Sequence, residues 1–329
     1  PEFQGEWEKC KLGDYGKVVT GNTPPTKDIE NYENGTYLWA SPADLGTIKL
    51  ISETKTMLSA KGFSKTRALP KGSVLVTCIG STIGKTGMAT KEMSTNQQIN
   101  SIVVNENSDN EFVYYSIQSA FPRYLSSIAV QAVPIISKSA FELLPNQRPC
   151  LQEQKKIGKM LSLLDERIAT QNKIIEDLKK LKSAIIEIEY TPNTKTTSHI
   201  GNVIEQISKR NKNNAIQNVL SVSNRQGFIK QSDQFENRNV ASEDTSNYKI
   251  VEKNDFAFNP ARINVGSIAR LTTFEKGIVS PMYICFRTQE NVAPEYIDFF
   301  FESKHFYCEI QKRLEGSVRQ CLSFEGLCN

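Results

Sequence analysis

The sequence predicts an α+β protein in which two β-rich α/β domains, residues 1–150 and 191–329, are separated by a long coiled-coil-forming helix over residues 151–190. Three observations support this fold class. The middle segment has an unbroken helical pattern. Both flanks contain short β-like runs between Gly, Asn and Pro residues. The flanks also repeat several short motifs in the same order. A chain of 329 residues is long enough for two separate cores.

The middle segment, Leu151 to Tyr190, contains no proline, a single glycine and mostly strong helix formers. From Ile157 to Leu178 its apolar residues recur in alternating steps of four and three, if Gln171 is counted, which is heptad spacing. Such a helix would be about 60 Å long, and its apolar stripe would need a partner helix. The residues predicted to contact that partner are Ile157, Leu161, Leu164, Ile168, Ile175, Leu178, Leu181, Ile185 and Ile188.

The two flanks are predicted to share a fold. Each has a β-like run, Ser101–Val104 and Met282–Phe286, and a moderate helix, Glu111–Ser119 and Glu295–Glu302. Four motifs recur in the same order about 185 residues apart, which favours a divergent duplication. They pair Leu12-Gly13-Asp14 with Ile200-Gly201-Asn202, Lys71–Leu75 with Lys253–Ala257, Glu111–Tyr115 with Glu295–Phe299, and Phe141-Glu142 with Phe324-Glu325.

The stretch Val76–Thr90, VTCIGSTIGKTGMAT, invites comparison with a phosphate-binding P-loop. A P-loop needs four residues between its first glycine and Gly-Lys-Ser/Thr, but only three separate Gly80 from Gly84. The segment after Lys85 also looks like a returning strand, whereas a P-loop opens a helix. We therefore interpret the stretch as a β-turn. Phe258–Arg262, FNPAR, likewise lacks the second proline and the aromatic residue of an adenine methyltransferase motif.

The composition argues against a metal centre or a catalytic site. Seven cysteines show no CxxC spacing, and the two histidines, His199 and His305, stand far apart along the chain. This inventory fits a reducing, cytoplasmic compartment, and no apolar run approaches the roughly 20 residues that span a bilayer. The net charge of +4 permits nucleic-acid binding without requiring it. We therefore predict a binding protein, not an enzyme.

At the entry to the long helix the sequence resembles a known family, the DNA-specificity (S) subunits of Type I restriction–modification systems. The resemblance lies in the order domain, helix, related domain, and in the junction FELLP (Phe141–Pro145) followed by LQEQKKI (Leu151–Ile157). The glycine hairpin Gly80–Lys85 and the motif TGNTP (Thr20–Pro24) are also similar to that family.

The resemblance implies two target-recognition domains, each reading one half of a bipartite site in double-stranded DNA. It implies that the helix is a spacer on which two methyltransferase subunits dock, and through them restriction subunits. No cofactor is expected in this chain, while S-adenosylmethionine is expected on the partner methyltransferase. The sequence departs from the family in lacking a second spacer helix. We therefore expect either a homodimer formed through residues 157–188 or a truncated chain.

If the chain reads DNA, Lys and Arg side chains should contact phosphates, while polar side chains on loops should contact base edges. The predicted phosphate contacts are Lys49, Lys55, Lys61, Lys65 and Arg67 in the first domain and Lys209, Arg210 and Lys212 in the second. The predicted base readers are Lys85, Gln97, Gln98, Asn224, Arg225, Arg262 and Asn264, and Thr23 is a further predicted DNA contact. An alternative hypothesis is a coiled-coil interaction scaffold that does not bind DNA, because a dimerisation helix fits either function.

Overall fold

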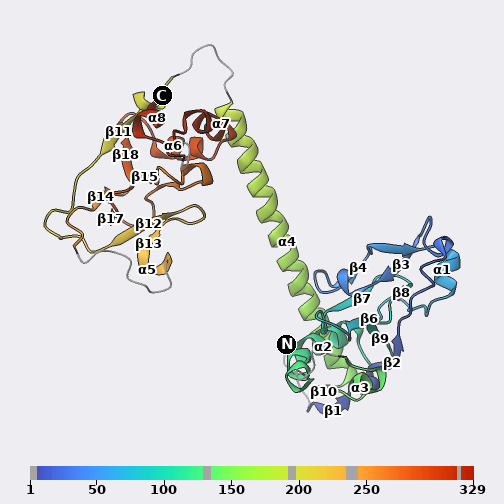
Figure 1. Cartoon of the computed structure of the whole chain (residues 1–329). Coiled ribbons are helices and arrows are strands. Elements are labelled where there is room, and N and C mark those ends of the chain that lie inside the picture. Colours follow the sequence, from blue (N-terminus) through green and yellow to red (C-terminus); the bar gives the residue numbers. More distant parts are fainter. Residues whose placement is uncertain (1–5, 129–134, 192–197, 235–243, 317–319) are drawn as a thin grey trace. The chain divides into compact units, whose positions relative to one another are not determined.

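The computed structural model describes residues 6–128, 135–191, 198–234, 244–316 and 320–329. The chain divides into two compact units, residues 1–172 (unit 1) and 173–329 (unit 2). The long helix α4 (Leu151–Tyr190) is continuous and has the predicted bounds (Figure 1). Among the described residues, none of the helices combines the length and apolar character that crossing a bilayer requires.

Unit 1 contains two main sheets. The first has the order β2-β9-β6-β7-β4, and all its neighbouring strands are antiparallel except the parallel pair β7 and β4. The second has the order β5-β3-β8, in which β3 and β8 are parallel. The strands are β1 (Glu8–Lys11), β2 (Gly16–Thr20), β3 (Tyr37–Ala40), β4 (Leu50–Ile51), β5 (Thr56–Leu58), β6 (Val74–Thr77), β7 (Thr86–Ala89), β8 (Met93–Thr95), β9 (Ile99–Val104) and β10 (Pro145–Arg148), with β1 paired to β10. The helices are η1 (Leu12–Tyr15), η2 (Ile29–Asn31), η3 (Pro42–Asp44), α1 (Ala60–Ser64), α2 (Asn110–Ile128) and α3 (Lys138–Glu142).

Unit 2 has the same plan. Its sheets have the orders β11-β18-β15-β16 and β13-β12-β17-β14, and β12 and β17 are the parallel pair. The strands are β11 (Ile204–Ile207), β12 (Val219–Ser223), β13 (Gly227–Lys230), β14 (Lys249–Glu252), β15 (Phe256–Phe258), β16 (Ile268–Arg270), β17 (Lys276–Val279) and β18 (Ile284–Thr288). The helices are η4 (Ile200–Asn202), α5 (Gln231–Gln234), η5 (Ile263–Val265), α6 (Pro294–Phe301), α7 (Lys304–Arg313) and α8 (Phe324–Cys328).

The two first sheets support the predicted duplication. The strand order β2-β9-β6-β7 in unit 1 corresponds to β11-β18-β15-β16 in unit 2, with antiparallel pairing throughout. The repeated glycines also have equivalent neighbours. A Cβ on Gly13 would lie 3.2 Å from the carbonyl oxygen of Glu142 at the end of α3, and one on Gly201 would lie 2.7 Å from Cβ of Cys328 at the end of α8. Each short helix is capped by a serine, Ser137 or Ser323.

The hairpin of β6 and β7 confirms the interpretation of the glycine-rich stretch. β7 follows the turn directly and pairs antiparallel with β6, so a strand stands where a P-loop would open a helix. Gly80 and Gly84 have φ angles of +93° and +91°, which side chains disfavour. Gly84 also has no room for a side chain, because its Cβ would lie 2.6 Å from the ring of Phe121.

Candidate nucleic-acid interface

In unit 1 the structure gathers several predicted DNA contacts from three loops. The side-chain nitrogen of Asn22 donates to the carbonyl of Lys65 at 2.9 Å, and its oxygen accepts from the backbone nitrogen of Arg67 at 3.0 Å. The Thr23 hydroxyl donates to the side-chain oxygen of Gln97 at 2.5 Å. We call the residues that these loops present the unit 1 loop cluster. They are Thr23, Lys65, Arg67, Gln97 and Gln98.

The close fit of these loops explains the TGNTP motif. A Cβ on Gly21 would lie 2.2 Å from the backbone oxygen of Asn96, so only glycine lets the first loop lie against the third. The side-chain oxygen of Asn96 accepts a hydrogen bond from the backbone nitrogen of Gln98 at 3.0 Å, which fixes the backbone of the third loop. Gln97 and Gln98 of the third loop are among the predicted base readers. The contact of this loop with Asn22 and Thr23 could not be read from the sequence, because the residues are more than 70 positions apart.

The predicted phosphate-binding lysines of this region already have acidic partners. Lys65 donates to Asp28 at 3.0 Å, and this hydrogen bond lowers the pKa of Asp28. Lys61 pairs with Glu30 and lies 3.7 Å from Asp28. A phosphate would have to compete with these carboxylates for the ammonium groups. Arg67 donates to the carbonyl of Thr20 at 2.6 Å, and Lys55 is exposed.

Lys85 and Lys49 are also not part of the unit 1 loop cluster. Lys85 is exposed on the β6–β7 turn, and its aliphatic stem lies against Gly46. Lys49 requires a correction, because its ammonium group is not free for a phosphate. The Lys49 side chain is only 12% exposed, and it donates to Glu111, Tyr115 and Ser162. Sequence reasoning missed this because a lysine on a loop is usually solvated.

In unit 2 the predicted readers occupy two neighbouring turns. Asn224 and Arg225 lie between β12 and β13, while Arg262 and Asn264 precede β16. The turns touch, since a Cβ on Gly266 would lie 3.7 Å from Cβ of Asn224. We call these turns the unit 2 turn pair. The turn before β16 corresponds to the β6–β7 turn of unit 1, and the strand registers align Lys85 with Ser267 and Arg262 with Gly80.

The predicted phosphate contacts of unit 2 lie elsewhere. Lys209, Arg210 and Lys212 are exposed in a segment beside β14, where the backbone oxygen of Lys209 accepts from Ile250 at 2.8 Å. Arg210 also donates to the side-chain oxygen of Asn247 at 2.8 Å. β14 and β13 are opposite edges of the same sheet, so the structure does not bring these basic residues to the predicted readers.

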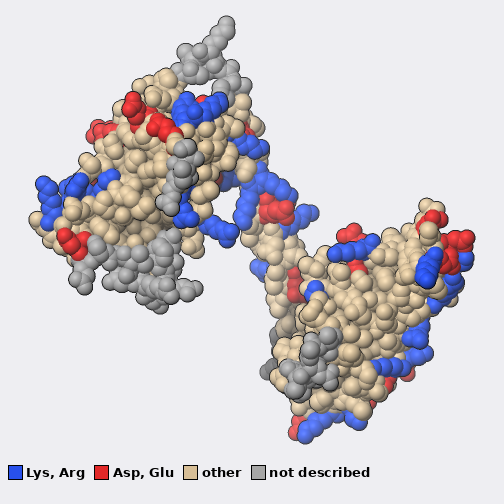
Figure 2. Space-filling model, in the orientation of Figure 1, with Lys and Arg blue, Asp and Glu red and all other residues tan. Residues whose placement is uncertain are grey.

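The apolar stripe of α4 divides into two parts. Ile157 requires a correction, because it packs against the core of unit 1 and is not available to a partner helix, and Leu161 is half-buried. The other seven predicted residues are 48% to 69% exposed, and we call them the α4 seam: Leu164, Ile168, Ile175, Leu178, Leu181, Ile185 and Ile188. Sequence reasoning missed Met160, Leu163 and Ile174, which add exposed apolar surface. Figure 2 shows acidic and basic side chains interspersed along the rest of this helix.

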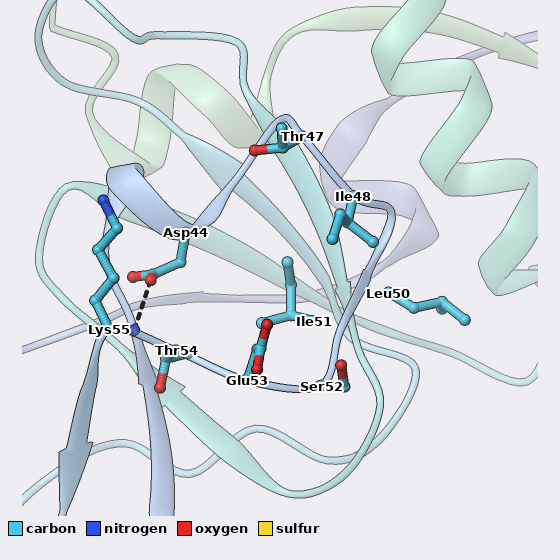
Figure 3. A pocket seen from close by; sticks show the side chains of 9 residues that line it. All are labelled: Asp44, Thr47, Ile48, Leu50, Ile51, Ser52, Glu53, Thr54 and Lys55. Carbon is cyan, nitrogen blue, oxygen red and sulfur yellow. Dashed lines mark hydrogen bonds between the residues drawn. The ribbon is translucent and has the colours of Figure 1, made fainter. Parts of the chain in front are cut away.

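Two hollows bring together residues that the sequence did not place in one site. In unit 1 the loop from Asp44 to Lys55 encloses about 290 Å³ (Figure 3), and Asp44 holds it closed by accepting from the backbone nitrogen of Lys55 at 2.8 Å. In unit 2 both histidines line one hollow of about 320 Å³, although they are far apart in sequence. Within the described ranges, however, no group of three or more His, Cys, Asp or Glu side chains could hold a metal ion.

The chain matches a protein-family model described as the Type I restriction modification DNA specificity domain, over residues 4–180. The match covers more than half of the 329 residues. The chain belongs to this family. The specificity-domain match includes the unit 1 loop cluster and most of α4.

Relatives of this specificity-domain protein are themselves specificity subunits. The chain is 30% identical over 182 residues to the Type I restriction enzyme MjaIX specificity subunit of Methanocaldococcus jannaschii, covering 54% of this chain and 42% of that protein. It is 33% identical over 126 residues to the HindI specificity subunit of Haemophilus influenzae, covering 37% and 27%. The aligned regions thus span less than half the length of either relative.

Solved structures show the same fold. One is the Type-I restriction-modification S subunit from M. genitalium. The alignment covers 100% of this chain and 84% of the M. genitalium chain, at 15% identity and a TM-score of 0.62. Another is the HsdS subunit from Thermoanaerobacter tengcongensis. Its alignment covers 98% of this chain and 83% of the HsdS chain, at 14% identity and a TM-score of 0.50. At such identities the likeness concerns the fold alone.

Proposed function

We propose that this chain is the DNA-reading subunit of a Type I restriction–modification system, and that it recognises a bipartite site in double-stranded DNA. In this proposal the unit 1 loop cluster reads one half of the site and the unit 2 turn pair reads the other. One observation carries the proposal: two units of the same sheet topology each present amide and cationic side chains on adjacent loops. A duplicated fold that presents polar loops in each unit suits a site made of two parts.

The chemistry of the loops fits base recognition. Gln97 and Gln98 in unit 1 carry amides, which can pair with the edge of adenine in the major groove. Arg225 and Arg262 in unit 2 carry guanidinium groups, which can donate two hydrogen bonds to guanine. Lysines near these loops would position the duplex by contacting phosphates.

The proposed partners are two methyltransferase subunits, which dock on α4 and connect the chain to restriction subunits. Family membership supports this. A solved structure from work on complex assembly of the type I R-M system also shares the fold, with a TM-score of 0.53. We also propose a homodimer through the α4 seam. The chain itself would be non-catalytic and cytoplasmic, with S-adenosylmethionine bound by the methyltransferase. Its seven cysteines are free thiols, as a reducing compartment would maintain them.

The test is selection of the full chain against random DNA duplex pools, read by gel shift at about 50 mM and about 200 mM salt. We expect enrichment of a two-part motif and a loss of affinity of about 10³-fold or more between the two salt concentrations, because bound phosphates release counterions. Pools that yield no enriched sequence would instead support the scaffold hypothesis. Incubation of the chain alone with DNA and S-adenosylmethionine should transfer no methyl group.

A further inference from the structure

The start of α4 is fastened to unit 1 by a polar network centred on Lys49. The Lys49 ammonium group donates to Glu111 Oε2 at 2.9 Å, to the Tyr115 hydroxyl at 3.0 Å and to the Ser162 hydroxyl at 3.0 Å. The Tyr115 hydroxyl donates in turn to Asp165 Oδ2 at 2.6 Å. Burial, together with the acceptor Asp165, raises the pKa of Tyr115, so the hydroxyl stays protonated as a donor. We call these five residues the helix clasp.

The helix contributes one continuous face to this contact. Gln154, Gly158, Ser162 and Asp165 follow at steps of four, four and three, which places them on the same side of α4. Gln154 is buried and accepts from the backbone nitrogen of Asp109 at 3.1 Å. A Cβ on Gly158 would lie 2.5 Å from Asp109 Oδ1, so the helix backbone touches the start of α2. This face is distinct from the α4 seam, which stays exposed.

The helix clasp is also attached to the first sheet of unit 1, through the backbone of Lys49. The backbone oxygen of Lys49 accepts from the backbone nitrogen of Met88 at 2.7 Å, which fixes the residue beside β4 and β7. Its neighbours Ile48 and Leu50 are exposed at the rim of the hollow in Figure 3, whereas the Lys49 side chain turns toward α2 and α4. A single residue therefore ties the sheet to both helices.

The clasp holds α4 near one end, so a small change in the angle of the helix there produces a large displacement at the other end. A helix of 40 residues is about 60 Å long. A tilt of about 10° at one end would move the other end by about 10 Å, or roughly three base-pair steps of duplex DNA. Small changes at the clasp would therefore be amplified along α4.

We propose that the helix clasp sets the gap between the two half-sites that the protein accepts, with Lys49 as a positioning residue and not a DNA contact. This inference rests on the proposed function, because a gap has meaning only for a bipartite site. A clasp that fixes the angle of α4 makes one gap length favourable and its neighbours unfavourable. A loosened clasp lets the helix adjust, so that several gap lengths bind comparably.

The test compares Lys49→Met and Tyr115→Phe with Lys91→Met, a matched exposed lysine on the turn before β8. Each full-length variant is titrated with duplexes that carry the selected motif with its gap shortened or lengthened by one base pair, which shifts and rotates one half-site. We expect wild type and Lys91→Met to lose about tenfold or more in affinity for each change. Lys49→Met should bind the altered gaps within about threefold of the original one, with Tyr115→Phe intermediate.

A second readout does not need DNA. Amide hydrogen exchange of α4 residues 158–168 should be at least about tenfold faster in Lys49→Met than in wild type, because the helix has lost its anchor. The inference would be overturned if folded Lys49→Met showed the same dependence of affinity on gap length as wild type, or the same rate of amide hydrogen exchange in residues 158–168. If wild type selects no DNA at all, the proposed function fails and the gap-setting role fails with it. That case is recognised because wild type and Lys91→Met then bind no duplex selectively, whereas failure of the clasp alone leaves both proteins binding the selected motif.

Discussion

Replacing Ile168 and Ile175 together by lysine is expected to convert the proposed homodimer into a monomer. Both side chains are about half-exposed on the α4 seam of a single chain, and burying the remaining surface against a second helix would stabilise the dimer by about 0.8–1.5 kcal/mol for each side chain. In a homodimer the double substitution removes four such side chains and places charges in the apolar interface. Association should therefore weaken by at least about 10³-fold.

The measurement is solution mass by analytical ultracentrifugation over a range of protein concentrations. The matched control is Ala169→Lys with Thr170→Lys, which adds the same charge on exposed positions roughly 110° and 150° around the helix from the seam. The control should remain as paired as wild type. A wild-type chain that stays monomeric at every concentration would contradict homodimerisation, as would a seam variant that pairs normally.

Phe141→Ala is expected to lower the free energy of unfolding by about 3–5 kcal/mol, because the deletion leaves a cavity in a fully buried position. Phe324→Ala, at the position that the sequence motif pairs with Phe141, should cost clearly less, about 1–3 kcal/mol. Phe324 is only half-buried, and its ring lies 6.3 Å from that of Phe286 at the edge of the unit 2 core. Urea unfolding followed by circular dichroism and by tryptophan fluorescence measures both variants.

The two variants serve as controls for each other, because the sequence gives no reason to rank them. The Phe-Glu motif pairs the two residues in sequence, but Phe141 is the fourth residue of α3 and Phe324 is the first of α8, so the serine caps align Phe141 with Leu327. Both tryptophans, Trp7 and Trp39, lie in unit 1, so fluorescence follows that unit and circular dichroism follows both. If both variants lose the same free energy of unfolding, the difference in burial between Phe141 and Phe324 that the structure shows would be contradicted.

Local patterns were sufficient for much of the fold. Helix propensity and heptad spacing placed α4 at its observed bounds, because a long run of helix formers between prolines has few alternatives. The predicted helix at Glu111–Ser119 lies within α2, which continues to Ile128 through Pro122. The strand predicted at Met282 begins only at Ile284. Such boundaries depend on pairing with other strands, which a local pattern does not contain.

The sequence by itself determined the α+β class, the long helix with its apolar stripe, the family resemblance and a β-turn in place of a P-loop. Only the tertiary structure decided which of the predicted residues meet: Thr23 with Gln97, the two turns of unit 2, and Lys49 with α4 in place of a phosphate. The physical reason is that helix and turn preferences act between neighbours in the chain. The partner of a buried charge or a loop amide is chosen by packing between segments far apart in sequence, and that choice leaves no periodic signal.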